Sequence, residues 1–206
     1  MTGPRTLSDK NEEISLPLVY LNITDKYERI TDKAIATMLY IYENLMDDFD
    51  WYLRANDDTF IIVENLKLFL ANKCPDEKIM YGKLLKHFNN AWLYRDGDNK
   101  RGFLQGGSGV VISRDSVRLF AEKYKQNPNF CIMYNGRAED QEISNCFRKL
   151  DVYPGESRDN KGRDRFLMDQ FHQLWNQPSQ DTLDYSFFPY KLVKFVDVFF
   201  KSCMFL

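Results

Sequence analysis

Three adjacent polar residues lie between two apolar segments of the chain. Asn56, Asp57 and Asp58 separate residues 51–55 from residues 59–63, and the composition of both segments predicts strands. Ligands collect at the carboxyl ends of strands in open α/β sheets. Carboxylates there are therefore well placed to bind a hard divalent cation, which typically also holds substrate phosphates. Because acidic pairs are also common in solvent-exposed turns, the pair alone leaves both interpretations open.

Two later stretches could also carry chemistry. The first, "FLQGGSGVVIS", contains Gly106, Gly107 and Gly109, which permit close approach of the backbone to a ligand, although a tight turn before a strand would use the same residues. The second, "AEDQEISNC", places Glu139 and Asp140 in the first turn of a predicted helix, where carboxylates suit the positive end of the helix dipole. Helix capping is the alternative to a catalytic role for this second acidic pair.

Strands that alternate with helices are predicted to position these stretches. Thr31 and Asp32 offer an N-cap for a helix whose apolar stripe runs to Phe49, and Ser113 offers an N-cap for a helix that runs to about Gln126. The remaining periodicity predicts strands at 16–23, 51–55, 59–63, 78–85 and 109–113, and further helices at 64–72 and from 138 onward. This alternation indicates an α/β sandwich.

The composition narrows the class of protein. The 206 residues are 44% hydrophobic and 15% aromatic, which is sufficient for one domain with a substantial core and argues against disorder. A net charge of −2 gives no reason to expect nucleic acid or an anionic membrane surface as a partner. No segment approaches the roughly 18 consecutive apolar residues that a membrane helix needs, and no signal peptide is visible.

Five stretches of the chain occur in an order that is typical of one family. They are "DDFDWYLRANDDTFIIVENL", "MYGKLLK", "FLQGGSGVVISRDSVRLF", "AEDQEISNCFRKLDV" and "GESRDNKGRDRF". From about residue 16 to residue 172 the chain thereby resembles the core 1 β1,3-galactosyltransferases, which are related to the Fringe-type β1,3-glycosyltransferases. The resemblance implies a GT-A type α/β fold, in which helices flank a Rossmann-like mixed sheet.

The resemblance also implies a sugar donor and a metal ion, which are UDP-galactose and Mn²⁺. The family's Asp-Asp-Asp motif corresponds here to Asn56, Asp57 and Asp58. Asp58 is therefore expected to ligate the metal directly, with Asp57 beside it and His172 as a further ligand. The residues expected to contact the donor are Asn56, Asp57, Gly106 and Gly107.

The acceptor implied by the resemblance is GalNAc attached to Ser or Thr of a glycoprotein, and the family also allows a homodimer. Transfer from an α-linked donor to a β-linked product is a single inverting displacement, which needs one base. The family places this base in the Glu-Asp pair, so Asp140 is the expected base and Glu139 its neighbour. Cys131 and Cys146 bracket the pair much as two cysteines do in the family, which implies a disulfide and an oxidising lumen.

The resemblance divides the chain into a loose segment 1–15, a partial GT-A domain 16–190 and a divergent apolar tail 191–206. Members of the family lie in the Golgi membrane, on the lumenal side, behind one N-terminal anchor. That anchor and the first strands, which hold the uridine, are expected to be missing before residue 16. The alternative to an enzyme is a non-catalytic relative or a truncated product that is chaperone-like or inactive. The retained Asp57, Asp58 and Asp140 favour the enzyme.

Overall fold

The computed structural model describes residues 18–86, 102–131, 138–170, 173 and 178–188. Its helices are α1 (Ile30–Asn44), α2 (Val63–Leu70), α3 (Arg114–Gln126), α4 (Glu139–Arg148) and α6 (Gln180–Tyr185). Its strands are β1 (Trp51–Arg54), β2 (Ile79–Gly82), β3 (Leu84–Leu85), β4 (Phe103–Leu104), β5 (Val110–Ser113) and β6 (Tyr153–Pro154). Short 3₁₀ helices lie at η1 (Tyr27–Arg29), η4 (Gly106–Ser108) and η5 (Pro128–Cys131).

The main sheet is mixed and has the strand order β1-β5-β2-β6. Strand β5 pairs antiparallel with β1 and with β2, whereas β2 pairs parallel with β6. The register places Arg54, the last residue of β1, opposite Val110, the first residue of β5. Strands β3 and β4 form a separate antiparallel pair. The predicted α/β architecture is therefore confirmed as a mixed sheet with helices against it.

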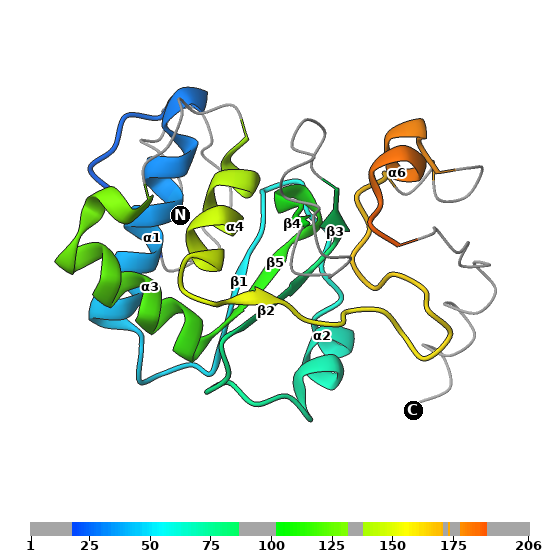
Figure 1. Ribbon diagram of the computed structural model, residues 1–206, viewed down its shortest axis with the longest axis horizontal. Coiled ribbons are helices and arrows are strands. Elements are labelled where there is room, and N and C mark those ends of the chain that lie inside the picture. The colour runs from blue at the N-terminus through cyan, green and yellow to red at the C-terminus, as the bar shows by residue number, and fades with distance from the viewer. Residues whose placement is uncertain (1–17, 87–101, 132–137, 171–172, 174–177, 189–206) are drawn as a thin grey trace, which may run out of the picture.

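Helices cover both faces of this sheet, as Figure 1 shows, with α1, α3 and α4 on one side and α2 on the other. Side chains alternate across a strand with a period of two. On β5, Ile112 accordingly joins the core formed with α1, α3 and α4, while Val111 joins a smaller cluster with α2 and Phe166. The larger core contains the fully buried Phe120 of α3 and Phe147 of α4. This core fixes the first turn of α4 beside the ends of the strands.

Helix α3 starts where the sequence predicts. The Ser113 side chain accepts a hydrogen bond from the backbone N–H of Ser116, which satisfies one of the free amide groups of the first turn. Helix α1 starts earlier than predicted, at Ile30, directly after η1. Thr31 therefore lies inside α1 instead of capping it, and its hydroxyl donates to Glu142 Oε2 of α4 at 3.0 Å.

Two predicted strands are wrong. Residues 18–23, the described part of the segment 16–23, form no strand, and their Tyr20 side chain is exposed instead of facing a core. Residues 59–62 are irregular and Val63 begins α2, so 59–63 is not a strand either. After β1, at the edge of the described sheet, the chain turns at Asn56, where the N–H of Thr59 donates to the Asn56 carbonyl, and then leads into α2, with the Phe60 side chain 88% exposed.

The implied disulfide is confirmed. Cys131, at the end of η5, is bonded to Cys146 of α4, and both residues belong to the larger core. The bond therefore ties α4 to the segment that precedes it. Among the described residues, no helix combines the length and the apolar character that crossing a bilayer requires.

Candidate active site

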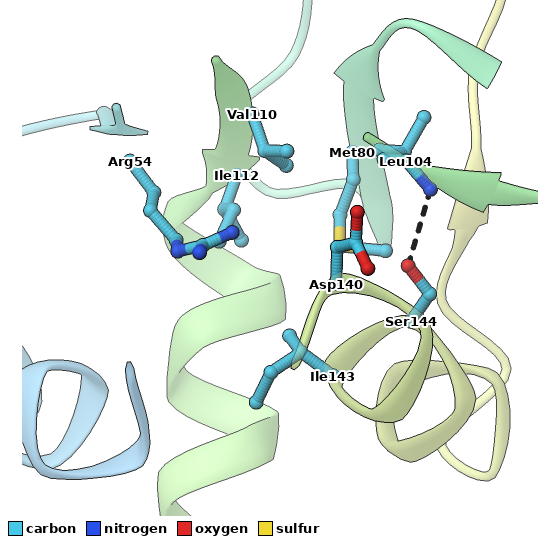
Figure 2. Close-up of a pocket in the computed structure, with 8 residues that line it drawn as sticks. All are labelled: Arg54, Met80, Leu104, Val110, Ile112, Asp140, Ile143 and Ser144. Carbon is cyan, nitrogen blue, oxygen red and sulfur yellow. Dashed lines mark hydrogen bonds between the residues drawn. The ribbon is translucent and has the colours of Figure 1, made fainter. Parts of the chain in front are cut away.

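A pocket lies where α4 meets the ends of the strands, and Figure 2 shows the side chains around it. Arg54 extends into it from the end of β1, and Asp140 rises from the first turn of α4 with its carboxylate directed toward the sheet. The remaining lining is mostly apolar and consists of Met80, Leu104, Val110, Ile112, Ile143 and Ser144. The cavity itself is small, about 10 Å³, which is room for about one water molecule, so it marks the junction of these side chains and not a fully formed substrate pocket.

The Asp140 carboxylate is held by two backbone amides. Its Oδ1 accepts from the N–H of Gln141 at 2.9 Å, and its Oδ2 accepts from the N–H of Gly106 at 3.3 Å. The second contact joins α4 to the glycine turn η4 across 34 residues of sequence. The structure therefore brings together the Gly stretch and the Glu-Asp pair, which the sequence identified separately.

Glu139 points elsewhere and is buried, with only 7% of its surface exposed. Its Oε2 accepts a hydrogen bond from Nη2 of Arg54, while its Oε1 has no hydrogen-bond partner among the described residues. Burial raises the pKa of the Glu139 carboxyl to about 7, because desolvation outweighs the opposing charge of Arg54, and the neighbouring charges of Asp140 and Glu142 raise it further. Glu139 thus faces the guanidinium and not the open pocket.

The glycines of the turn at 106–109 let its backbone lie close to neighbouring groups. A Cβ at Gly106 would lie 2.8 Å from Nη1 of Arg54, so a side chain at this position would have to displace the guanidinium that packs against the backbone here. Gly109 has a φ of 85°, a left-handed conformation that favours glycine, and its N–H donates to the carbonyl of Gly106. At Gly107, a Cβ would meet only the side chain of Gln105 in the same turn.

The turn at Asn56, Asp57 and Asp58 adjoins the glycine turn. Thr59 links the two, because its hydroxyl donates to the carbonyl of Gly107 at 2.9 Å and accepts from the N–H of Asn56 at 3.0 Å. The three polar residues themselves are exposed. All three stretches with predicted chemistry are therefore connected to one another at the same end of β1 and β5.

The metal prediction concerns Asp57, Asp58 and His172. His172 lies outside the described residues. Within the described part of the chain, no three His, Cys, Asp or Glu side chains gather as a metal site. The exposed carboxylates of Asp57 and Asp58 are hard oxygen donors. They suit a cation that keeps water and substrate phosphates as its other ligands, as Mg²⁺ and Mn²⁺ sites commonly do.

Sequence reasoning missed Arg54 and Ser144. Arg54 is the last residue of β1, two positions before Asn56, and a charged residue at the end of an otherwise apolar strand is a signal that could have identified it. Ser144 lies one helical turn after Asp140, and its Oγ accepts from the N–H of Leu104 at 3.2 Å (Figure 2). No sequence signal distinguishes Ser144 from an ordinary helix residue.

This chain is similar to several curated proteins whose names describe sugar transfer or glycan synthesis. Residues of this chain are 28% identical over 150 residues to glycoprotein-N-acetylgalactosamine 3-beta-galactosyltransferase 1 of Xenopus laevis, which covers 73% of this chain and 38% of that protein. They are 25% identical over 141 residues to human chondroitin sulfate synthase 3, covering 66% and 15%. They are 27% identical over 142 residues to human beta-1,3-glucosyltransferase, covering 68% and 26%.

The matched part of this chain thus spans well under half the length of these relatives. One family model covers a similar share of the chain. The model described as galactosyltransferase matches residues 7–154 of the 206, which include the Asn56–Asp58 turn, the glycine turn and all of α4. On this match, the chain is a member of the galactosyltransferase family.

Proposed function

We propose that this chain transfers galactose from UDP-galactose to the 3-hydroxyl of GalNAc on Ser or Thr of a glycoprotein, with inversion at the sugar carbon. The proposal rests on one observation above all: the Asp140 carboxylate lies in the pocket where the Asn56–Asp58 turn, the glycine turn and α4 are connected. The similarity to a relative named for this reaction supports the choice of donor and acceptor.

Asp140 is the proposed base. The acceptor's O3–H bond breaks as O3 attacks the anomeric carbon, the proton passes to the Asp140 carboxylate, and UDP leaves with the electron pair of the broken C1–O bond. Two backbone N–H groups fix the carboxylate in the pocket, so its orientation does not depend on the substrate. Glu139 is excluded from this role in the proposal because its Oε2 already binds Arg54.

Asp58 and Asp57 are proposed to hold Mn²⁺ together with the diphosphate of the donor. When bound, the ion neutralises the charge that develops on the leaving UDP. Asn56 supplies an amide oxygen beside them, and Gly106 and Gly107 bring backbone close to the sugar. The fold of this domain is proposed to be of the GT-A type, and its compartment to be the Golgi lumen, where the Cys131–Cys146 disulfide is stable.

The test is radiolabelled transfer to a GalNAc-threonine peptide with four donors in parallel: UDP-galactose, UDP-glucose, UDP-glucuronate and UDP-GalNAc. The four donors separate the activity proposed here from those that glucosyl- and chondroitin-forming relatives suggest. We expect transfer from UDP-galactose only, and loss of this transfer by about 10²–10⁴-fold in Asp140→Asn with unchanged donor binding. Preference for another donor would overturn the choice of galactose, and no transfer from any donor would favour a non-catalytic relative.

Donor binding is tested separately by calorimetry of UDP with and without Mn²⁺. Asp58→Ala is expected to abolish the Mn²⁺-dependent part of the affinity, whereas Asn56→Asp is expected to preserve or strengthen it, because the metal prefers charged oxygen ligands. Glu64→Gln is a matched control, since it removes an exposed carboxylate from the first turn of the neighbouring α2. Equal affinity of Asp58→Ala and the parent protein for Mn²⁺-UDP would contradict the metal assignment.

A further inference from the structure

The contact between Arg54 and Glu139 joins two elements that are 85 residues apart in sequence. Arg54 ends β1, and Glu139 begins α4, directly before Asp140. The same guanidinium lies against the backbone of Gly106, whose N–H donates to Asp140. The Arg54 guanidinium therefore contacts both the first turn of α4 and the glycine turn, which together hold the Asp140 carboxylate.

We propose that Arg54 and Glu139 form a positioning pair, which holds the first turn of α4 against the glycine turn and so sets where the Asp140 carboxylate lies. The inference rests on the proposed function for its catalytic consequence, but the geometry itself can be tested without any transfer activity. Neither residue is proposed to touch the substrate, and both act through Asp140.

A role in stability alone explains this contact poorly. A buried ion pair is a weak stabiliser, because both charges must be taken out of water, and an apolar pair of the same volume often serves as well or better. Here the penalty is higher than usual, since Oε1 of Glu139 has no partner among the described residues and burial raises the Glu139 pKa to about 7. A costly contact at the edge of a candidate active site is typical of a functional constraint.

The Arg54–Glu139 pair can constrain the position of Asp140 in two ways. Glu139 and Asp140 are consecutive residues in the first turn of α4, so anchoring one limits the position of the other. The guanidinium also occupies the space beside Gly106 that any side chain at that position would fill. If the pair is broken, α4 and the glycine turn lose a shared contact, and the 3.3 Å bond from Gly106 N–H to Asp140 is expected to lengthen.

The first experiment reads the Gly106 amide by NMR at pH 8, above the pKa of Glu139. Gln followed by Gly occurs once in the sequence, at Gln105–Gly106, so labelling with ¹³C-carbonyl glutamine and ¹⁵N-glycine selects this single amide. Glu139→Met is the informative variant, because Arg54→Met would disturb Gly106 directly. We expect the Gly106 signal in Glu139→Met to move most of the way to its position in Asp140→Ala, which removes the bond.

The second experiment compares kinetics with stability. Arg54→Met and Glu139→Met are each expected to lower kcat by about 10²-fold, because small displacements of a catalytic group cost this much, with little change in donor Kd. The double variant Arg54→Met/Glu139→Met should recover thermal stability but not kcat, and Arg54→Lys should restore part of kcat. Arg114→Met is the matched control: Arg114 pairs with Asp50 and Asp76 at the other end of β1 and β5, and its loss should leave kcat unchanged.

Three outcomes would contradict the inference that Arg54 and Glu139 position Asp140. An unmoved Gly106 signal in Glu139→Met would show that Asp140 is positioned without it. Recovery of kcat together with stability in the double variant would assign the pair to stability alone. A large loss of donor affinity in Arg54→Met with an unmoved Gly106 signal would make Arg54 a direct ligand contact. A moved signal in a protein that transfers no sugar would refute the proposed function and leave the positioning pair standing.

Discussion

The burial of Glu139 predicts that this protein loses stability as the pH rises through the neutral range, and that Glu139→Gln removes this loss. The folded protein holds the Glu139 carboxyl with a pKa of about 7, whereas the ordinary value is 4.5. The folded state therefore binds a proton at Glu139 more tightly than the unfolded state does. Its contribution to stability is fully present below about pH 4.5 and is lost as the pH rises through about 7.

The size of the effect follows from the pKa difference. A difference of about 2.5 pH units between the folded and unfolded states corresponds to about 3 kcal/mol, because each unit is worth 1.36 kcal/mol. Glutamine resembles the protonated acid in shape and charge. Glu139→Gln should therefore exceed the free energy of unfolding of the parent protein by less than about 1 kcal/mol at pH 5 and by about 3 kcal/mol at pH 8 and above.

The assay is urea unfolding of both proteins at pH 5, 6, 7 and 8, with the disulfide intact. Only the difference between variant and parent is interpreted, because the effects of all other titrating groups are common to the two proteins and cancel in this difference. Glu64→Gln controls for the loss of a carboxylate at a helix start, since Glu64 is exposed in the first turn of α2.

A difference that stays constant from pH 5 to pH 8 would refute the reasoning. It would mean that Arg54 keeps Glu139 ionised throughout, so that the attraction between the two charges outweighs the desolvation of the carboxylate. A difference of the opposite sign, with Glu139→Gln less stable at pH 8 than at pH 5, would lead to the same conclusion.

Three further predictions concern packing. Replacing both Cys131 and Cys146 by serine should lower the free energy of unfolding by about 3 kcal/mol for a sequence separation of 15, and equal urea midpoints with and without the bond would contradict this. Gly106→Ala places a Cβ 2.8 Å from the Arg54 guanidinium and should cost about 1–3 kcal/mol by urea unfolding; an unchanged midpoint would mean that the arginine moves freely. Phe120→Ala, at a fully buried position, should cost about 3–5 kcal/mol in calorimetry, and a loss below 1 kcal/mol would contradict its place in the core.

The sequence was sufficient for elements whose signals are local. The start of α3 was predictable because the Ser113 side chain bonds to an amide three residues away, and α4 because its acidic first turn and apolar stripe lie within one segment. The pairing of Cys131 with Cys146 followed from the family resemblance and the short separation of the two residues.

The parts that could not be predicted depend on contacts between distant residues. An apolar run such as 59–63 is compatible with a strand, but the partner of β1 is the distant β5, and the Phe60 side chain, 88% exposed, packs against no part of the described sheet. The contact of Arg54 with Glu139 is similarly invisible in sequence, because nothing near either residue indicates the other. The three stretches that meet at this end of the sheet could therefore be identified from the sequence, while the pairing of Arg54 with Glu139 could not.

The connections within the site all have long sequence separations, and this has a consequence for folding. Thr59 meets Gly107 across 48 residues, Gly106 meets Asp140 across 34, and Arg54 meets Glu139 across 85. Closing such loops costs chain entropy before the contacts return any energy, so contacts of this kind form late and slow the folding of a domain. Partly folded chains that already contain α1 or α3 would lack the assembled pocket. Occupancy of the site by a ligand would then report that the chain from β1 to α4 has completed its fold, which makes binding a more stringent measure of native structure than helix content.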